Sequence, residues 1–154
     1  MKLAELLTPD RVAIMEKNGT PPTKGDVLGE VARLLSHGGK HPVSAIHKVL
    51  VEREALQSTG IGDGVAIPHG SLSDLDQQVG AVLTVPRGVD FDSIDAGDVQ
   101  LVVALVSPKT QSGEHLKTLA RISRILRSKA FRERLVESKD PREVYDLLLA
   151  EDAL

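Results

Sequence analysis

Apolar residues recur with helical spacing in two segments of the first third of the chain. Thr23 and Asp26 have the spacing of a capping box before the first segment, and Gly38-Gly39 ends it. Pro42 suits the first turn of a helix in the second segment. The spacing therefore predicts two amphipathic helices, each with one face toward a core. Their apolar positions are Val27, Leu28, Val31, Leu34 and Leu35, and then Val43, Ile46, Val49 and Leu50.

The middle of the chain has the patterns of strands and turns. Residues 58–70 hold four glycines and a proline around one short apolar run, residues 65–67. This composition predicts a loop, a short strand and then a tight turn that carries His69. Residues 78–85 alternate between apolar and other positions, which predicts a strand. The continuous apolar run Leu101–Val106 predicts a strand that is buried on both faces.

The last third of the chain is predicted to be helical. One helix is expected over residues 112–127, a short one from about Lys129, and a final one that opens with Asp140-Pro141. Helices before, between and after strands indicate the α/β class. We expect a single domain over residues 1–154, an α/β sandwich in which helices flank a small mixed sheet. The expected buried positions are Leu116, Leu119, Ile122 and Leu126, and then Val144, Leu147 and Leu148.

Composition and charge exclude several classes of protein. The chain of 154 residues has no cysteine, which excludes disulfides, thiolate metal sites and a cysteine nucleophile. Two phenylalanines and one tyrosine are too few for a base-stacking platform, and a net charge of −3 does not attract nucleic acid. No apolar run reaches the roughly 18 residues of a membrane span, and the N-terminus lacks a signal-peptide layout. We expect a soluble, cytoplasmic protein that does not insert into membranes.

Charge is unevenly distributed along the chain. Residues 74–98 hold six aspartates against one arginine, whereas residues 114–134 hold seven basic residues against two acidic ones. The favoured interpretation of the basic segment is a solvated helical surface, and the alternative is a docking surface for an acidic partner.

His69 is the first candidate for chemistry. It lies between Pro68, which fixes its own backbone torsion, and Gly70, which allows a sharp turn and leaves room for a large partner. A neutral imidazole is a good nitrogen nucleophile near pH 7 because its ordinary pKa is about 6.5. The alternative is a histidine that only hydrogen-bonds to the backbone of a turn.

Other residues could complete a site around His69. Arg53, at the end of the second helix, suits a phosphoryl group, or is a solvated helix-end arginine. His115, in the first turn of the third major helix, points inward or toward a cleft and stays neutral, or is a core histidine. The glycines at 60, 62 and 64 could turn amides toward an anion, or serve turns that need positive φ. The remaining histidines form no compelling metal-ligand set; they are His37, His41 and His47.

Two motifs together resemble a known family. Residues 53–70 read Arg-Glu-Ala-Leu-Gln-Ser-Thr-Gly-Ile-Gly-Asp-Gly-Val-Ala-Ile-Pro-His-Gly. This stretch resembles the active-site signature of the fructose/mannitol-type enzyme IIA of the bacterial phosphoenolpyruvate-dependent phosphotransferase system. Ser107-Pro108, followed by His115-Leu116 and Leu119, resembles the second histidine motif of that family. The resemblance covers about residues 3–149 and is greatest to the stand-alone nitrogen-regulatory branch, although Gln57 and Ser71 depart from its usual pattern.

The resemblance implies a phosphotransferase component that works through a phosphohistidine. His69 would accept the phosphoryl group from a carrier protein of the HPr type, Arg53 would neutralise its charge, and His115 would orient His69 or hydrogen-bond the phosphate. Ser58 and Thr59 would complete the set of groups that bind the phosphate. Neither a metal nor another cofactor is implied. The recipient would be a regulatory target protein or, in the sugar-uptake alternative, a IIB domain.

A non-catalytic regulatory binding module with the same fold is the alternative from another class. A serine or metal hydrolase is a weaker one, because the chain lacks a nucleophile elbow and a convincing ligand triad.

Overall fold

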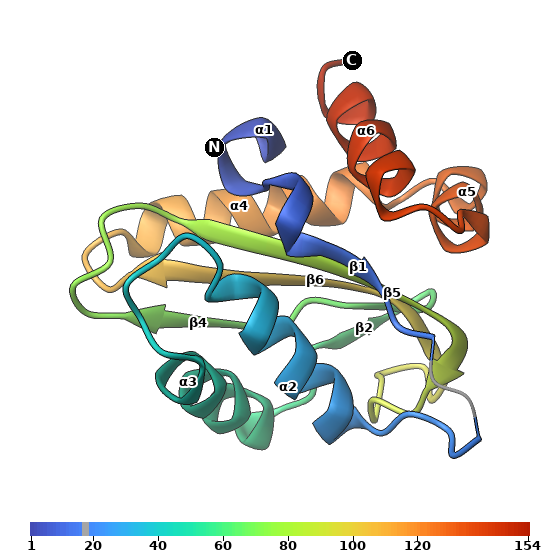
Figure 1. Cartoon of the computed structure of the whole chain (residues 1–154), viewed down its shortest axis with the longest axis horizontal. Coiled ribbons are helices and arrows are strands. Elements are labelled where there is room, and N and C mark those ends of the chain that lie inside the picture. Colours follow the sequence, from blue (N-terminus) through green and yellow to red (C-terminus); the bar gives the residue numbers. More distant parts are fainter. Residues whose placement is uncertain (17–18) are drawn as a thin grey trace.

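In residues 1–16 and 19–154, which the computed structural model describes, six strands form one mixed sheet. The strands run in the order β1-β5-β6-β3-β2, and β4 also pairs with β6. Helices cover both faces of the sheet (Figure 1). The strands are β1 (Val12–Ile14), β2 (Gly60–Gly62), β3 (Val65–Ala66), β4 (His69–Leu72), β5 (Val79–Val89) and β6 (Val99–Pro108). The helices are α1 (Leu3–Leu6), η1 (Pro9–Arg11), α2 (Lys24–Leu35), α3 (Val43–Leu56), α4 (Ser112–Ile125), α5 (Lys129–Glu137) and α6 (Pro141–Asp152).

Strand β6 organises the sheet and both layers of the core. It runs antiparallel to β5 and parallel to β3 and β4. Because side chains alternate along a strand, its even positions pack with α2 and α3, and its odd positions pack with α1, α4, α5 and α6. The α/β sandwich and the doubly buried strand at 101–106 are therefore confirmed. The two sets are Val102, Ala104 and Val106, and Leu101, Val103 and Leu105.

The predicted helix starts agree with the local chemistry. The Thr23 side chain accepts from the amide of Asp26, and the Asp26 side chain accepts in return from the amide of Thr23, which completes the capping box of α2. Pro42 is the N-cap of α3 rather than a residue of its first turn. The Asp140 side chain caps α6, and Pro141 begins that helix as predicted.

Four local predictions were wrong. Val43, predicted on the core-facing side of α3, is 40 % exposed, because it lies in the first turn of the helix, before the buried residues Ile46 and Leu50. Leu116 is not buried: its side chain is 66 % exposed, while Thr118 is fully buried. The reason is that the first turns of α4 pack over two polar side chains, Gln78 and Ser107. The helix face that contacts these side chains is therefore polar, and Leu116 lies off that face.

His69 begins strand β4 instead of lying on a tight turn, because residues 69–72 pair in parallel with β6. Gly70 lies within that strand and permits a close approach to α3 rather than a turn.

Several charges of the basic segment have acidic partners. The Arg121 Nε lies 2.5 Å from Oδ1 of Asp152 and links α4 to α6. Exposed pairs on single helices join Lys117 to Glu114 and Lys129 to Glu133. The exposed pairs fit a solvated helical surface, and the docking surface stays a prediction. Among the described residues, the helices are too short or too polar for any of them to cross a membrane.

Candidate active site

The pairing of β4 with β6 brings the two candidate histidines together. His69 lies opposite Leu105, and Ser71 lies opposite Ser107, so alternation places His69 and Ser107 on the sheet face that α4 covers. The chain turns after Pro108, enters α4 at Ser112 and returns His115 over Ser107. The rings of His69 and His115 are 5.3 Å apart between centroids and tilted by 53°.

The protonation of His69 follows from its hydrogen bond. Its Nδ1 lies 2.7 Å from the carbonyl oxygen of Ile67. A carbonyl oxygen only accepts, so Nδ1 carries the proton and donates it, and Nε2 of the neutral ring carries the lone pair. The ring is half-buried rather than sealed in the interior. His69 therefore has its nucleophilic nitrogen on the side away from the backbone.

Burial keeps both histidines neutral near pH 7. It is the largest influence on the pKa of His69 and lowers it below the ordinary value. The positive charge of Arg53 lowers the pKa of His69 further, while the Ile67 hydrogen bond and the charge of Glu54 oppose this effect. Burial also lowers the pKa of His115, and the neighbouring His69 adds to that shift. A neutral His69 is the form that can act as a nucleophile.

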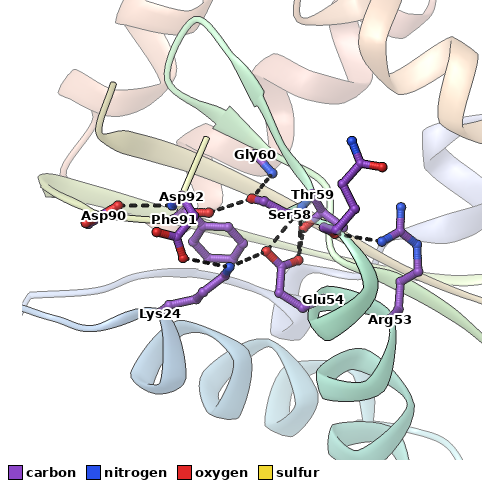
Figure 2. Close-up of polar contacts among 10 residues, drawn as sticks. Lys24, Arg53, Glu54, Ser58, Thr59, Gly60, Asp90, Phe91 and Asp92 are labelled. Atoms are coloured by element: carbon purple, nitrogen blue, oxygen red, sulfur yellow. Dashed lines mark hydrogen bonds and ion pairs between the residues drawn. The ribbon is translucent and has the colours of Figure 1, made fainter. Parts of the chain in front are cut away.

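Arg53 is held at the end of α3 by its own helix. One guanidinium nitrogen, Nη1, donates to the carbonyl oxygen of Gln57, the C-cap residue, at 2.8 Å (Figure 2). This bond fixes the side chain and leaves the other guanidinium donors for a ligand. The positive charge of Arg53 also lowers the pKa of His69.

Glu54 is a buried anchor that sequence reasoning missed. Its carboxylate accepts from the amide of Thr59 at 3.0 and 3.1 Å and from the Thr59 hydroxyl at 2.5 Å. Lys24 of α2 lies 2.7 Å from the same carboxylate and also over the ring of Phe91 (Figure 2). Glu54 follows Ile46 and Leu50 at four-residue spacing, and this spacing was the signal that the residue faces the core. Glu54 therefore links α2 and the residue before β2 to the end of α3, and these contacts fix the helix end that carries Arg53.

Comparison with known proteins shows the family of the chain. Residues 5–151 match the family model described as phosphoenolpyruvate-dependent sugar phosphotransferase system, EIIA 2. This chain belongs to that family. A nitrogen regulatory protein of Bradyrhizobium diazoefficiens is 33% identical over 149 residues, which are 96% of this chain and 95% of that protein. The crystal structure of the nitrogen regulatory protein IIA-Ntr from Neisseria meningitidis has a TM-score of 0.86 and 31% identity, with 95% of this chain and 98% of that chain covered.

Sugar-specific EIIA proteins are relatives as well. The fructose-specific EIIABC component of Bacillus subtilis is 29% identical over 153 residues, which are 99% of this chain and 24% of that protein. The mannitol IIA of Escherichia coli has a TM-score of 0.75 at 23% identity, covering 92% of this chain and 98% of that chain, which shows the shared fold. The match to the family model confirms, at the level of the family, the resemblance seen in residues 53–70. Proteins of the EIIA family are phosphoryl carriers.

The structure places the remaining predicted residues of the EIIA motif in internal hydrogen bonds. The Ser58 hydroxyl donates to the carbonyl oxygen of Phe91 at 2.5 Å and accepts from the amide of Gly60 at 3.0 Å (Figure 2). Thr59 is buried and its hydroxyl is held by Glu54. A role for Ser58 and Thr59 in holding phosphate stays a prediction, and it requires these internal bonds to be exchanged for bonds to the ligand.

Two of the three glycines at 60, 62 and 64 serve a turn, whereas Gly60 lies in β2 without a positive φ and permits the close approach of Ser93. Gly62 and Gly64 have φ of +95° and +77°, and they close the hairpin between β2 and β3. The amide of Asp63 between them donates to the exposed carboxylate of Asp95 at 3.1 Å, so this amide already binds an anionic side chain of the protein itself. Within the described residues, the histidine and acidic side chains form no group of three or more that could hold a metal ion.

Proposed function

We propose that this protein accepts a phosphoryl group on Nε2 of His69 from the phosphohistidine of a small carrier protein of the HPr type. The observation that carries the proposal is the Nδ1 hydrogen bond to Ile67, which leaves the lone pair on Nε2 of a neutral, partly exposed ring. Burial supports the same conclusion by lowering the pKa of His69, so the nucleophilic form predominates at pH 7.

The transfer needs positioning and charge stabilisation more than proton transfer. The new Nε2–P bond forms as the N–P bond of the donor breaks, and the donor imidazole recovers its lone pair, so no proton has to move. Arg53 and His115 supply hydrogen-bond donors for the equatorial oxygens of the phosphoryl group. The Nδ1–H bond to Ile67 persists in the product and stabilises the positive charge that phosphorylation places on the ring.

The phosphorylated protein then acts as a nitrogen-regulatory phosphocarrier, whose phosphorylation state controls target proteins in the cytoplasm. The nitrogen regulatory relatives, which match nearly the whole chain, support this branch. A sugar-specific IIA that passes phosphate to a IIB domain is the second candidate. It is supported by the fructose-specific relatives and by a mannitol IIA of the same fold solved with its phosphorylated IIB partner.

Phosphorylation with purified components tests the proposal. The protein, incubated with phosphoenolpyruvate, enzyme I and an HPr-type carrier, is expected to gain an acid-labile, alkali-stable phosphoryl group. The label is expected to vanish in His69→Ala and to persist in His47→Ala, which changes a half-buried histidine of α3. Absence of label in the wild-type protein with every carrier tried would leave the non-catalytic binding module. Onward transfer to a fructose- or mannitol-type IIB domain would favour sugar uptake.

A further inference from the structure

A chain of buried polar side chains ends at Nδ1 of His115. The Thr118 hydroxyl lies 2.6 Å from Oε1 of Gln78, and Nε2 of Gln78 lies 3.0 Å from the Ser107 hydroxyl. The same Ser107 oxygen lies 2.6 Å from Nδ1 of His115. Thr118 and Ser107 are fully buried, and Gln78 is only 2 % exposed. The hydrogen-bonded chain therefore begins and ends on the first turns of α4, and it passes through Gln78, which directly precedes β5, and Ser107 of β6.

The chain has a direction, because its amide has one donating and one accepting end. A contact of 2.6 Å is typical of O–H···O, and one of 3.0 Å is typical of N–H···O. Oε1 only accepts, so Thr118 donates to it, and Nε2 of Gln78 only donates, so it occupies an acceptor site of Ser107. Among the described residues, His115 is the only other hydrogen-bond partner of the Ser107 hydroxyl, so the hydroxyl hydrogen is directed to Nδ1 of His115, which then carries a lone pair.

This direction gives the two neighbouring histidines opposite tautomers. His69 holds its proton on Nδ1, against Ile67, and exposes a lone pair on Nε2. His115 accepts on Nδ1, so its single proton is on Nε2. A ring with Nε2–H is a hydrogen-bond donor without a nucleophilic pair at that atom. The pair is thus divided into one nucleophile and one donor.

We propose that Gln78 and Thr118 are positioning residues that fix the proton of His115 on Nε2, so that this ring donates to the transferred phosphoryl group and does not accept it. The role of His115 as a donor to the phosphoryl group rests on the proposed function of His69. The tautomer of His115 does not depend on that function. Burying an amide and two hydroxyls is unfavourable unless each is hydrogen-bonded, and an apolar cluster would hold α4 equally well. Orientation of His115 is what the polar chain adds.

Nitrogen-15 NMR of the unphosphorylated protein tests the inference directly. Two-bond correlations from the ring carbon-bound protons distinguish Nδ1–H from Nε2–H for each histidine, and we expect Nδ1–H at His69 and Nε2–H at His115. Gln78→Glu replaces the amide donor by an acceptor, so the Ser107 hydroxyl turns toward it and the His115 proton moves to Nδ1. The transfer rate to His69 is expected to fall about 100-fold, because a donor to the phosphoryl oxygens is lost. Gln77→Glu adds the same charge at the exposed neighbouring position and is expected to change neither the tautomer nor the rate.

Thr118→Val keeps the inference testable if Gln78→Glu does not fold. This near-isosteric change removes the donor that orients the amide, so the His115 nitrogens are expected to move toward the average of the two tautomers. Thr118→Ser is expected to restore the Nε2–H pattern. An Nδ1–H pattern at His115 in the wild-type protein, or an unchanged pattern in the folded variants, would overturn the inference. If the tautomer test fails but His69 is phosphorylated, the proposed function stands. If His69 is not phosphorylated but both histidines have the expected tautomers, only the proposed function is refuted.

Discussion

The carbonyl of Ile67 and the hydroxyl of Ser107 face the same atom, Nδ1, of two neighbouring histidines. The carbonyl can only accept, whereas the hydroxyl is able to donate, and this difference separates the chemistry of two chemically identical rings. At the scale of single residues, the site is thus defined less by which side chains it contains than by their immediate hydrogen-bond partners. Arg53 is the third candidate residue, and its positive charge lowers the pKa of His69.

Replacing Arg53 by glutamine is expected to slow phosphorylation of His69 about 100-fold, because a forked cationic donor to the phosphoryl oxygens is lost. The pKa of His69 is expected to rise at the same time, because the cation that lowers it is gone. A phosphorylation time course and an NMR titration of the ring protons measure the two effects. Arg33→Gln, which removes an exposed arginine of α2, is the matched control. A wild-type transfer rate in Arg53→Gln would exclude Arg53 from the site.

At the scale of elements, the site depends on how closely α3 lies against β4. A Cβ added at Gly70 would lie 3.2 Å from a methyl carbon of Val49, which is closer than side chains normally pack. The residue after His69 is therefore a glycine because a helix crosses it at short range. One turn beyond Val49, the same helix carries Arg53, so the spacing of the two elements sets the position of the guanidinium.

Gly70→Ala is expected to push α3 away from β4. The overpacked contact lowers the free energy of unfolding by about 1–2 kcal/mol, and the displacement of Arg53 lowers the rate of phosphorylation. Urea denaturation and the transfer assay measure the two effects. In the control Gly29→Ala, the added methyl in α2 meets nothing within 4 Å, so the protein is expected to become more stable by about 0.5–1 kcal/mol. Unchanged stability and rate in Gly70→Ala would contradict the close approach.

Glu54→Gln is expected to lower the free energy of unfolding by about 2 kcal/mol. The glutamine side chain cannot accept hydrogen bonds from both the backbone N–H and the hydroxyl of Thr59 and also neutralise Lys24. Buried donors therefore lose part of their hydrogen bonding. Glu52→Gln, two residues earlier, removes a carboxylate whose exposed contact with Lys48 is 4.0 Å long, and it is expected to change stability by less than about 0.5 kcal/mol. Equal effects of the two variants in urea denaturation would refute the anchor.

Periodicity predicted the elements that carry enough residues to show a pattern. Helices α2, α3 and α6 and the long strands β5 and β6 were all predicted from apolar spacing and end signals. Strands β1, β2 and β4 were not, because strands of three or four residues show no clear alternation and form through pairing with β5, β3 and β6. Leu116 was predicted in the core because the polar patch under α4 comes from residues distant in sequence, Gln78 and Ser107.

At the scale of the whole molecule, the pairing of β4 with β6 brings together His69 and His115, which lie far apart in the chain. Arg53, at the end of α3, is the third candidate residue, and the family motifs in the sequence pointed to all three. The motifs did not predict the partners that set their protonation, namely Ile67 and Ser107. Those partners become visible only when the register of β4 against β6 is known.

Folding also couples the two histidines to pH. Their pKa values are lowered in the folded protein, so the unfolded chain binds more protons. Their contribution to stability is therefore complete above the unfolded pKa of about 6.5 and is lost as the pH falls toward the folded values. Urea denaturation across this pH range is expected to show a shallower loss of stability in the double variant His69→Gln, His115→Gln than in the wild type. Identical pH dependence in both proteins would contradict the shifted pKa values.

NMR of the phosphorylated protein shows whether Nε2 of His69 is the phosphoryl acceptor. With nitrogen-15-labelled histidine, phosphorus–nitrogen coupling is expected at Nε2 of His69, while Nδ1 keeps its proton in the bond to Ile67. His115 is expected to remain unphosphorylated. Phosphorus on Nδ1 of His69, or on any other residue, would contradict the account.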